Sequence, residues 1–252
     1  MPKATIRLTN AVTSLEIGTK VIPTWAITFD PGLYEFGPPT GVRDRGGVIS
    51  PSKGAAGATV PISSLNGATG SLPEYEVTDS SKYQATLRYS WFESTVTPVD
   101  NLGEPCFNPS ENMPIQGQLD VLTESSNYIQ GYRKWFKGGL KSNSSTFLTS
   151  DLIRSSLDHS STGATSQTFE MLASSYPGCK RIVIAIPADT GIRVKEVWLK
   201  SASNADILSE FKLQAQTVKV EGANGYKAIP YNVWVYEPAK LDSTEVYTIT
   251  LG

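Results

Sequence analysis

Few residues of this sequence carry the side chains that catalysis or metal binding most often uses. The chain of 252 residues contains one histidine, His159, and two cysteines, Cys106 and Cys179. A zinc site built on His and Cys needs three or four converging ligands, and the sequence has only these three residues to offer. A Ser-His-Asp triad or a Cys-His pair would have to use His159, whose polar segment 157–161 has no Gly-x-Ser-x-Gly motif. We therefore expect no catalytic residue, no metal and no cofactor.

Other common site motifs are also missing from the sequence. Two glycine-rich segments, 46–48 and 53–58, lack the spacing of a phosphate-binding loop, and we interpret both as flexible loops. There is no EF-hand loop either. A glycosidase needs only two carboxylates in a cleft, and 24 acidic residues always offer such pairs. A hydrolase therefore stays a rival hypothesis without a residue that points to it.

Aromatic and basic residues give a second set of candidates. The tryptophans are Trp25, Trp91, Trp135, Trp198 and Trp234. Tryptophans can stack on sugar rings, but aromatic side chains dominate cores and interfaces, so we predict packing for all five. We interpret the basic and aromatic segment 133–137 as a solvated strand face, because one short cluster in an acidic chain is a weak sign of nucleic-acid binding. Residues 43–45 (Arg-Asp-Arg) fit an interchain ion pair or a solvated loop.

The composition is typical of a folded protein with polar outer faces. Hydrophobic residues make up 39% and aromatic residues 10%, which excludes a mainly disordered chain. The formal net charge of -2 gives no electrostatic footprint for nucleic acid. The sequence has no apolar run long enough to span a membrane, and its first ten residues do not resemble a signal peptide. We expect synthesis in a cytoplasm, with both cysteines as free thiols.

Alternating apolar residues predict many short strands. The expected strands are 4–10, 15–17, 21–29, 74–78, 83–92, 115–122, 128–136, 168–172, 181–187, 194–199, 211–220, 231–236 and 245–251. The clearest pattern is in 83–92, where alternate residues are aromatic or aliphatic and share one face. They are Tyr83, Ala85, Leu87, Tyr89 and Trp91. The continuous apolar run 181–187 predicts a central buried strand. Segment 148–157 predicts one short helix, with Thr149 or Ser150 as its N-cap.

These elements predict an all-β protein with two β-sandwich-like domains, 1–126 and 127–252. The polar residues 124–127 indicate a short linker between the domains. Segment 42–72 is rich in Gly, Ser, Ala and Pro, and it predicts a long loop in the first domain. We expect this loop to be an arm that packs against another subunit. A substrate loop is the alternative.

Several motifs follow one another in a fixed order along the chain. They are 15–23 (LEIGTKVIP), 132–139 (YRKWFKGG), 148–154 (LTSDLIR), the strand block that ends at Pro187, 225–226 (GY) and 231–236 (YNVWVY). In this order, the motifs of the second half resemble a β-sandwich domain that recurs, often at or near the C-terminus, in structural proteins of tailed bacteriophages. Segment 15–23 resembles a segment that often precedes that domain. The matches touch most of residues 15–36 and 128–251, and segment 42–72 has no counterpart.

The resemblance implies a non-enzymatic structural component in or on the tail, neck or baseplate of a tailed phage particle. It carries no catalytic residue over to this chain. Its expected partners are further copies of the chain, as a trimer or ring, and other virion proteins, with neither nucleic acid nor membrane. The expected location is the virion, after synthesis in the host bacterial cytoplasm. A receptor- or glycan-binding tip, a head-decoration protein and a polysaccharide depolymerase are the alternatives, and exposed aromatic side chains at the sandwich loops would favour the tip.

Overall fold

A computed structural model gives the fold of the chain. It describes residues 2–10, 12–31, 44–54, 58–92, 94–96, 113–115, 121–143, 145–156, 158–160 and 162–252, and the structural statements below concern these residues. Within them, the chain consists mainly of β-strands with a single α-helix, α1 (Ser150–Arg154). The prediction of an all-β, sandwich-like fold with one short helix is confirmed.

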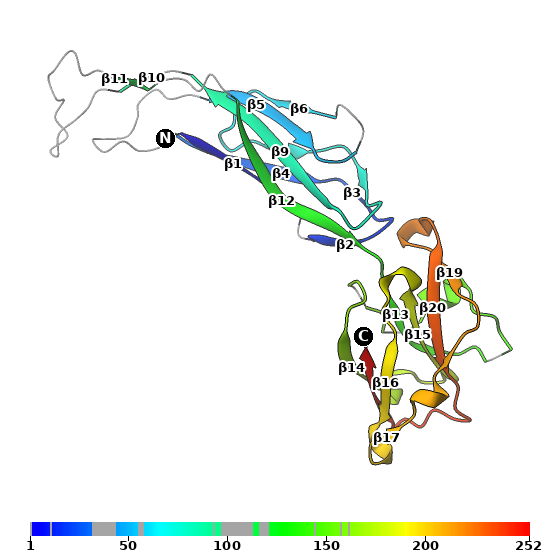
Figure 1. The fold of residues 1–252 in the computed structure, drawn as a ribbon. Coiled ribbons are helices and arrows are strands. Elements are labelled where there is room, and N and C mark those ends of the chain that lie inside the picture. The colour runs from blue at the N-terminus through cyan, green and yellow to red at the C-terminus, as the bar shows by residue number, and fades with distance from the viewer. Residues whose placement is uncertain are drawn as a thin grey trace. The chain divides into compact units, whose positions relative to one another are not determined.

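The chain divides into two compact units (Figure 1). The first unit consists of Met1–Thr13, Lys20–Glu76 and Ser81–Gln130, and the second of Ser14–Thr19, Val77–Ser80 and Gly131–Gly252. The second unit thus includes two short segments from the N-terminal half of the sequence. As a result, the chain passes from one unit to the other five times, after residues 13, 19, 76, 80 and 130.

The described part of the first unit is made of antiparallel strands. They are β1 (Lys3–Leu8), β3 (Lys20–Val21), β4 (Thr24–Asp30), β5 (Asp44–Pro51), β6 (Val60–Ile62), β7 (Thr69–Ser71), β8 (Tyr75–Glu76), β9 (Lys82–Trp91), β10 (Ser94–Val96), β11 (Met113–Ile115) and β12 (Leu122–Tyr132). One sheet has the order β1-β4-β7, and another places β12, β9, β5 and β6 side by side. Two further pairs are β3 with β8 and β10 with β11.

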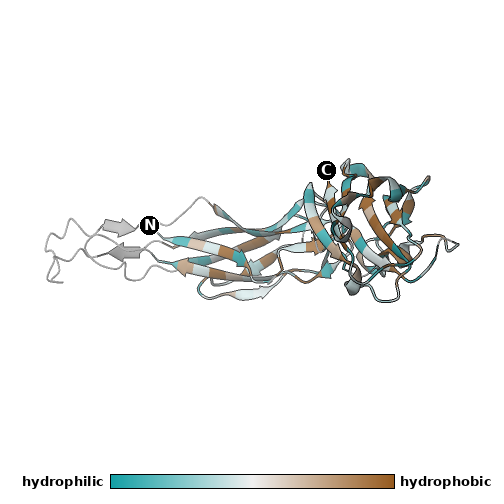
Figure 2. Cartoon of the chain, turned by 90° about the horizontal axis from the view of Figure 1, so that it is seen from below, coloured by the Kyte–Doolittle hydropathy of each residue, from teal (hydrophilic) through white to brown (hydrophobic). Residues whose placement is uncertain are grey.

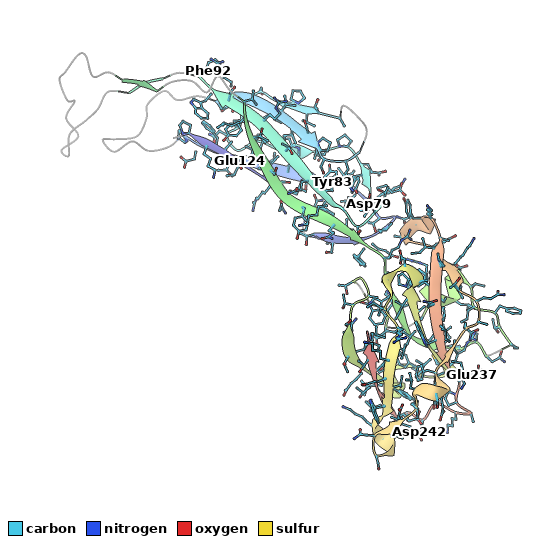
Figure 3. The ribbon with its side chains drawn as sticks, in the orientation of Figure 1. Asp79, Tyr83, Phe92, Glu124, Glu237 and Asp242 are labelled. Atoms are coloured by element: carbon cyan, nitrogen blue, oxygen red, sulfur yellow. The ribbon has the colours of Figure 1, made fainter. Side chains whose placement is uncertain are left out.

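Strand β9 shows how alternation builds the core of the first unit. Its inward residues are Tyr83, Ala85, Leu87, Tyr89 and Trp91, and all of them are buried, as expected. Figure 3 shows Tyr83 near one end of this strand and Phe92 just beyond the other end. The Tyr89 hydroxyl accepts a hydrogen bond of 3.0 Å from the backbone N–H of Ala4 on β1. This bond links the two sheets, whose hydrophobic residues are brown in Figure 2.

Segment 42–72 differs from the expected long loop, because β5, β6 and β7 lie within it. Strand β5 pairs with β9 and β6 pairs with β5, so these residues form strands in a sheet of their own chain. The Asp44 carboxylate organises this region by accepting hydrogen bonds of 2.8 Å from the N–H groups of Gly46 and Leu65. Gly46 has a φ of 74°, and the register against β9 shifts there. Sheet pairing outweighs the low strand propensity of glycine and serine.

The polar stretch 124–127 is not a linker, because it lies inside strand β12. The register of β12 against β9 shifts between Ser125 and Tyr128, so the residues between them leave the regular ladder. The buried Ser126 hydroxyl accepts a 2.9 Å bond from the N–H of Ala85 on β9. Ser126 and Asn127 therefore form a β-bulge, in which the Ser126 hydroxyl replaces a regular backbone hydrogen-bond acceptor.

Two sheets also form the second unit. Their strands are β13 (Phe136–Leu140), β14 (Gln167–Leu172), β15 (Arg181–Pro187), β16 (Val194–Leu199), β17 (Ala205–Asp206), β18 (Lys212–Leu213), β19 (Val218–Val220), β20 (Ile229–Tyr236) and β21 (Val246–Leu251). One sheet has the order β13-β15-β20-β18, with β19 also on β20, and the other has the order β14-β21-β16-β17. The 3₁₀ turns are η2 (Ala173–Ser175), η3 (Ala188–Thr190), η4 (Lys200–Ala202), η5 (Leu208–Glu210) and η6 (Ala223–Gly225). Strand β2 (Ser14–Glu16) pairs with β12.

Strand β15 is buried on both of its faces, as its continuous apolar sequence predicts. Ile182, Ile184 and Ile186 belong to a core that includes residues of β14, β16 and β21. Val183 and Ala185 face the other way, into a second core that includes residues of α1 and β20. The helix therefore covers the outer face of this sheet.

Three expected elements of the second unit have different bounds. The strand expected at 128–136 is two strands, because β12 ends at Tyr132 and β13 begins at Phe136. The strand expected at 211–220 is also two, β18 and β19, which both pair with β20 around the exposed residues 214–217. The helix is shorter than 148–157, although the Thr149 hydroxyl caps it as expected, at 3.3 Å from the Leu152 N–H.

Candidate functional site: the Arg154 cluster and the clefts of the second unit

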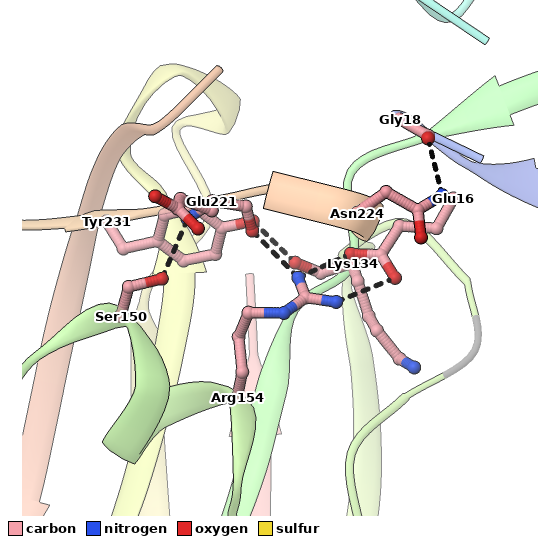
Figure 4. Close-up of polar contacts among 8 residues, drawn as sticks. All are labelled: Glu16, Gly18, Lys134, Ser150, Arg154, Glu221, Asn224 and Tyr231. Atoms are coloured by element: carbon pink, nitrogen blue, oxygen red, sulfur yellow. Dashed lines mark hydrogen bonds and ion pairs between the residues drawn. The ribbon is translucent and has the colours of Figure 1, made fainter. Parts of the chain in front are cut away.

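A partly buried charge cluster joins α1 to strand β2 in the second unit (Figure 4). The Nη1 and Nη2 atoms of Arg154 donate to the two carboxylate oxygens of Glu16 at 2.6 and 3.2 Å. Nη1 also donates to the backbone carbonyl of Glu221 at 2.7 Å. The Glu16 side chain is 11% exposed and that of Arg154 is 27% exposed. A two-point Arg–carboxylate contact of this kind is both strong and specific in direction.

The local sequence places Arg154 at the end of a short, firmly attached helix. Thr149 caps the helix, and Asp151 lies in its first turn. Ile153 is fully buried and packs into the core beside β15. The Ser150 hydroxyl accepts a 3.0 Å bond from the Glu221 N–H, so the residue after β19 is held from both ends of α1.

Backbone hydrogen bonds attach the segment 14–19 to the rest of the second unit. Ile17 donates to the Tyr132 carbonyl at 2.9 Å and accepts from the Ala223 N–H at 2.9 Å. Gly18 donates to the Val77 carbonyl at 2.7 Å, and its own carbonyl accepts from the Asn224 side chain at 3.0 Å. Gly18 also has a φ of 98° and no room for a Cβ atom. These bonds make segment 14–19 a part of the second unit.

The electrostatics of the cluster favour a structural role. The hydrogen bond that Arg154 donates to Glu16 raises the pKa of Arg154, and burial, the second largest cause, lowers it. An arginine stays protonated in proteins and cannot act as a general base. The cluster holds three elements together, namely α1, β2 and the residue that follows β19.

The basic and aromatic segment 133–137 is not the solvated face we expected. Trp135 and Phe136 are buried. Lys137 lies over the Phe169 ring at 4.4 Å and pairs with Asp158 at 3.2 Å. Arg133 lies over the Tyr226 ring. The cationic groups of Arg133 and Lys137 thus contact aromatic rings of their own chain, and Lys137 also pairs with a carboxylate.

The five tryptophans divide into four buried residues and one exposed residue. Trp25, Trp91, Trp135 and Trp234 are at most 7% exposed, which confirms the packing interpretation for them. Trp198 on β16 is 37% exposed, so packing within the chain does not account for its whole surface. No row of exposed tryptophans exists among the described residues.

The structure describes four of the remaining candidates from the sequence: His159, Cys179, Asp44 and Arg45. His159 is exposed, and its Nδ1 atom lies 3.4 Å from the Ser156 carbonyl. Cys179 is a buried free thiol whose pKa is raised by burial. Cys106 and Arg43 lie outside the described residues. Asp44 stabilises a turn, and Arg45 lies over the Phe92 ring at 4.6 Å.

The described surface has three notable clefts, all lined by the second unit. One of about 550 Å³ lies between residues 173–180 and 237–243, and Glu237 in its lining is labelled in Figure 3. A smaller one of about 310 Å³ lies beside Gly139 and Cys179. The third, of about 660 Å³, lies between 147–150 and 214–219. The sequence did not predict these clefts, because each joins segments that are distant in the chain.

Among the residues that the structure describes, no group of three or more His, Cys, Asp or Glu side chains is arranged to hold a metal ion. No described helix is both long and apolar enough to cross a membrane.

Comparisons with known proteins add no relative. No family model, no curated protein and no solved structure matches this chain.

Proposed function

We propose that this chain is a non-enzymatic structural component of a tailed phage particle. It assembles as a homo-oligomer in or on the tail, neck or baseplate. The observation that carries the proposal is that the motifs of the second half, which resemble a domain of phage structural proteins, all lie in the second unit. Within them, Trp135 and Ile153 fill its two cores, and Arg154 binds Glu16. The motifs therefore specify a scaffold, which is what a structural module requires.

Outer strands give the second unit a means of association. Strand β14 is the last strand on one side of its sheet within the described chain, and its Leu172 is exposed. An outer strand presents backbone groups that another chain can pair with. Closed cyclic assembly satisfies such surfaces in every copy, and a stable interface of this kind buries about 1,200–2,000 Å².

The oligomeric state of the purified full chain tests this proposal. Size-exclusion chromatography with light scattering should give a mass that is two or more times 27.2 kDa, in a whole-number ratio. Negative-stain images of the same fractions should show one closed, symmetric particle. A mass of 27.2 kDa at every concentration would contradict self-assembly.

A further inference from the structure

The most exposed aromatic side chain of the described chain lies beside its third cleft. Phe147 is 90% exposed, although a phenylalanine ring gains stability from burial. It immediately precedes Leu148, which packs against the core beside β15. The ring therefore projects from a segment that is attached to the core.

A buried arginine holds the residues that precede Phe147 in the chain. Arg181 on β15 is only 3% exposed, and its Nη2 atom donates to the Ser142 hydroxyl at 2.8 Å and to the Thr146 carbonyl at 3.1 Å. The Thr146 N–H also closes a turn with the Asn143 carbonyl at 3.0 Å. Thr146 and Leu148, the neighbours of Phe147 in the chain, are thus both held by contacts with the core. The backbone at Phe147 is therefore fixed in a position that exposes the ring.

The wall opposite Phe147 is polar. It is formed by residues 214–219, of which 214–217 lie between β18 and β19 and the last two belong to β19. Gln214, Gln216 and Thr217 are exposed, and no side-chain hydrogen bond joins them to another described residue. Their amide and hydroxyl groups offer both donors and acceptors to a ligand.

The charge of the cleft is set by one residue. Lys219 is the only ionisable side chain in the lining, and the lining contains no carboxylate. On the helix side, the Ser150 and Thr149 oxygens accept backbone hydrogen bonds, which leaves their hydroxyl hydrogens available. One lysine is too little charge for a nucleic-acid backbone, which needs several cations along its path.

We propose that this cleft binds a saccharide that carries a carboxylate group. The apolar face of a sugar ring stacks on Phe147, and the sugar hydroxyls bond to Gln214, Gln216 and Thr217. Lys219 pairs with the carboxylate, which favours an acidic sugar over its neutral counterpart. A volume of about 660 Å³ holds a short oligosaccharide. Binding here does not depend on the oligomeric state, so this proposal and the proposed function can fail separately.

The test uses the full chain and an array of oligosaccharides that contain uronic or sialic acids, each printed beside its neutral counterpart. We expect the chain to bind acidic members of the array, and added salt to weaken that binding. Phe147→Ala should lower the affinity about tenfold or more, whereas Phe147→Trp should retain it. Lys219→Gln should reduce the preference for acidic over neutral sugars.

Trp198→Ala is the matched control, because Trp198 is an exposed aromatic residue of the same unit that does not line the cleft. It should bind like the unmodified chain. Circular dichroism should show that all variants are folded, since Phe147 and Lys219 are exposed. The proposal is overturned if no acidic saccharide on the array binds, or if Phe147→Ala binds as well as the unmodified chain.

Discussion

The Arg154 guanidinium donates hydrogen bonds to both carboxylate oxygens of Glu16, at 2.6 and 3.2 Å, although the two residues are 138 positions apart in the sequence. This contact makes the N-terminal segment 14–19 a part of the second unit. It explains why the second unit extends beyond the continuous block 131–252. The contact also gives a role to an arginine that the helix pattern alone left unassigned.

Removing this arginine should destabilise the second unit. Arg154→Ala removes two charge-assisted bonds to Glu16 and one bond to the Glu221 carbonyl, and it leaves a largely buried carboxylate unpaired. We expect a loss of about 2–3 kcal/mol in the free energy of unfolding, measured by urea denaturation. Lys200→Ala is the control, because it breaks the exposed pair with Glu170 in the same unit, and it should cost under about 1 kcal/mol. An equal loss of unfolding free energy in the two variants would show that the Arg154 contact stabilises the fold no more than an exposed ion pair does.

A glycine in the same segment should be sensitive to added volume. A Cβ atom on Gly18 would lie 2.1 Å from the Ala223 carbonyl oxygen, and the φ of 98° disfavours any other residue. Gly18→Ala should therefore cost about 3 kcal/mol or more in thermal or urea unfolding. Gly178→Ala is the matched control, with a φ of 73° and nothing within 4 Å, and it should cost only about 1–2 kcal/mol. A Gly18→Ala chain as stable as the Gly178→Ala chain would contradict the tight contact.

An asparagine in the bulge of β12 should protect a backbone amide on β1. The Asn127 side chain accepts a 2.7 Å bond from the Leu8 N–H and donates a 3.3 Å bond to the Leu8 carbonyl. Asn127→Ala should lower the stability of the first unit by about 1–2 kcal/mol. Hydrogen exchange should show faster exchange of the Leu8 amide, while that of Ile182 in the second unit stays slow. Unchanged exchange at Leu8 would refute the bond.

Buried tyrosines should make the fold sensitive to alkaline pH. Burial, and next the neighbouring Tyr75, raises the pKa of Tyr83 to about 12. Burial also raises the pKa of Tyr176 and Tyr231. The unfolded chain releases these protons near pH 10 whereas the folded chain keeps them, so the stability is complete below about pH 10 and falls as the pH rises further.

Absorbance of tyrosinate during an alkaline titration checks this expectation. A fraction of the tyrosines should ionise only together with the loss of the circular-dichroism signal. Ionisation of every tyrosine near pH 10 in a still folded chain would contradict the burial of these rings.

Sequence reasoning predicted the elements whose pattern is strong. The alternation in 83–92 and the apolar run 181–187 gave the right strands, because burial of one or both faces leaves a direct trace in residue type. The helix cap was narrowed to Thr149 or Ser150 for a similar reason, since a hydroxyl satisfies local N–H groups, and Thr149 is the cap in the structure.

The missed features depend on partners that are distant in the sequence. Residues 44–51 form a strand because β9 pairs with them, and their glycines gave no local sign of it. The polar residues 124–127 look like a linker until Ala85 and Leu8 supply the partners of Ser126 and Asn127. In the same way, the exposure of Phe147 depends on the buried Arg181, which sequence alone assigned to a strand of the core.

Proteomics of purified particles tests the proposed function most directly. Particles would be banded on a density gradient after nuclease treatment of a lysed culture of the host that carries this sequence. We predict that tryptic peptides of the chain, from both units, band with the nuclease-protected particles at a fixed ratio to the other particle proteins. Peptides found only in the unassembled protein at the top of the gradient would contradict a structural place in the particle.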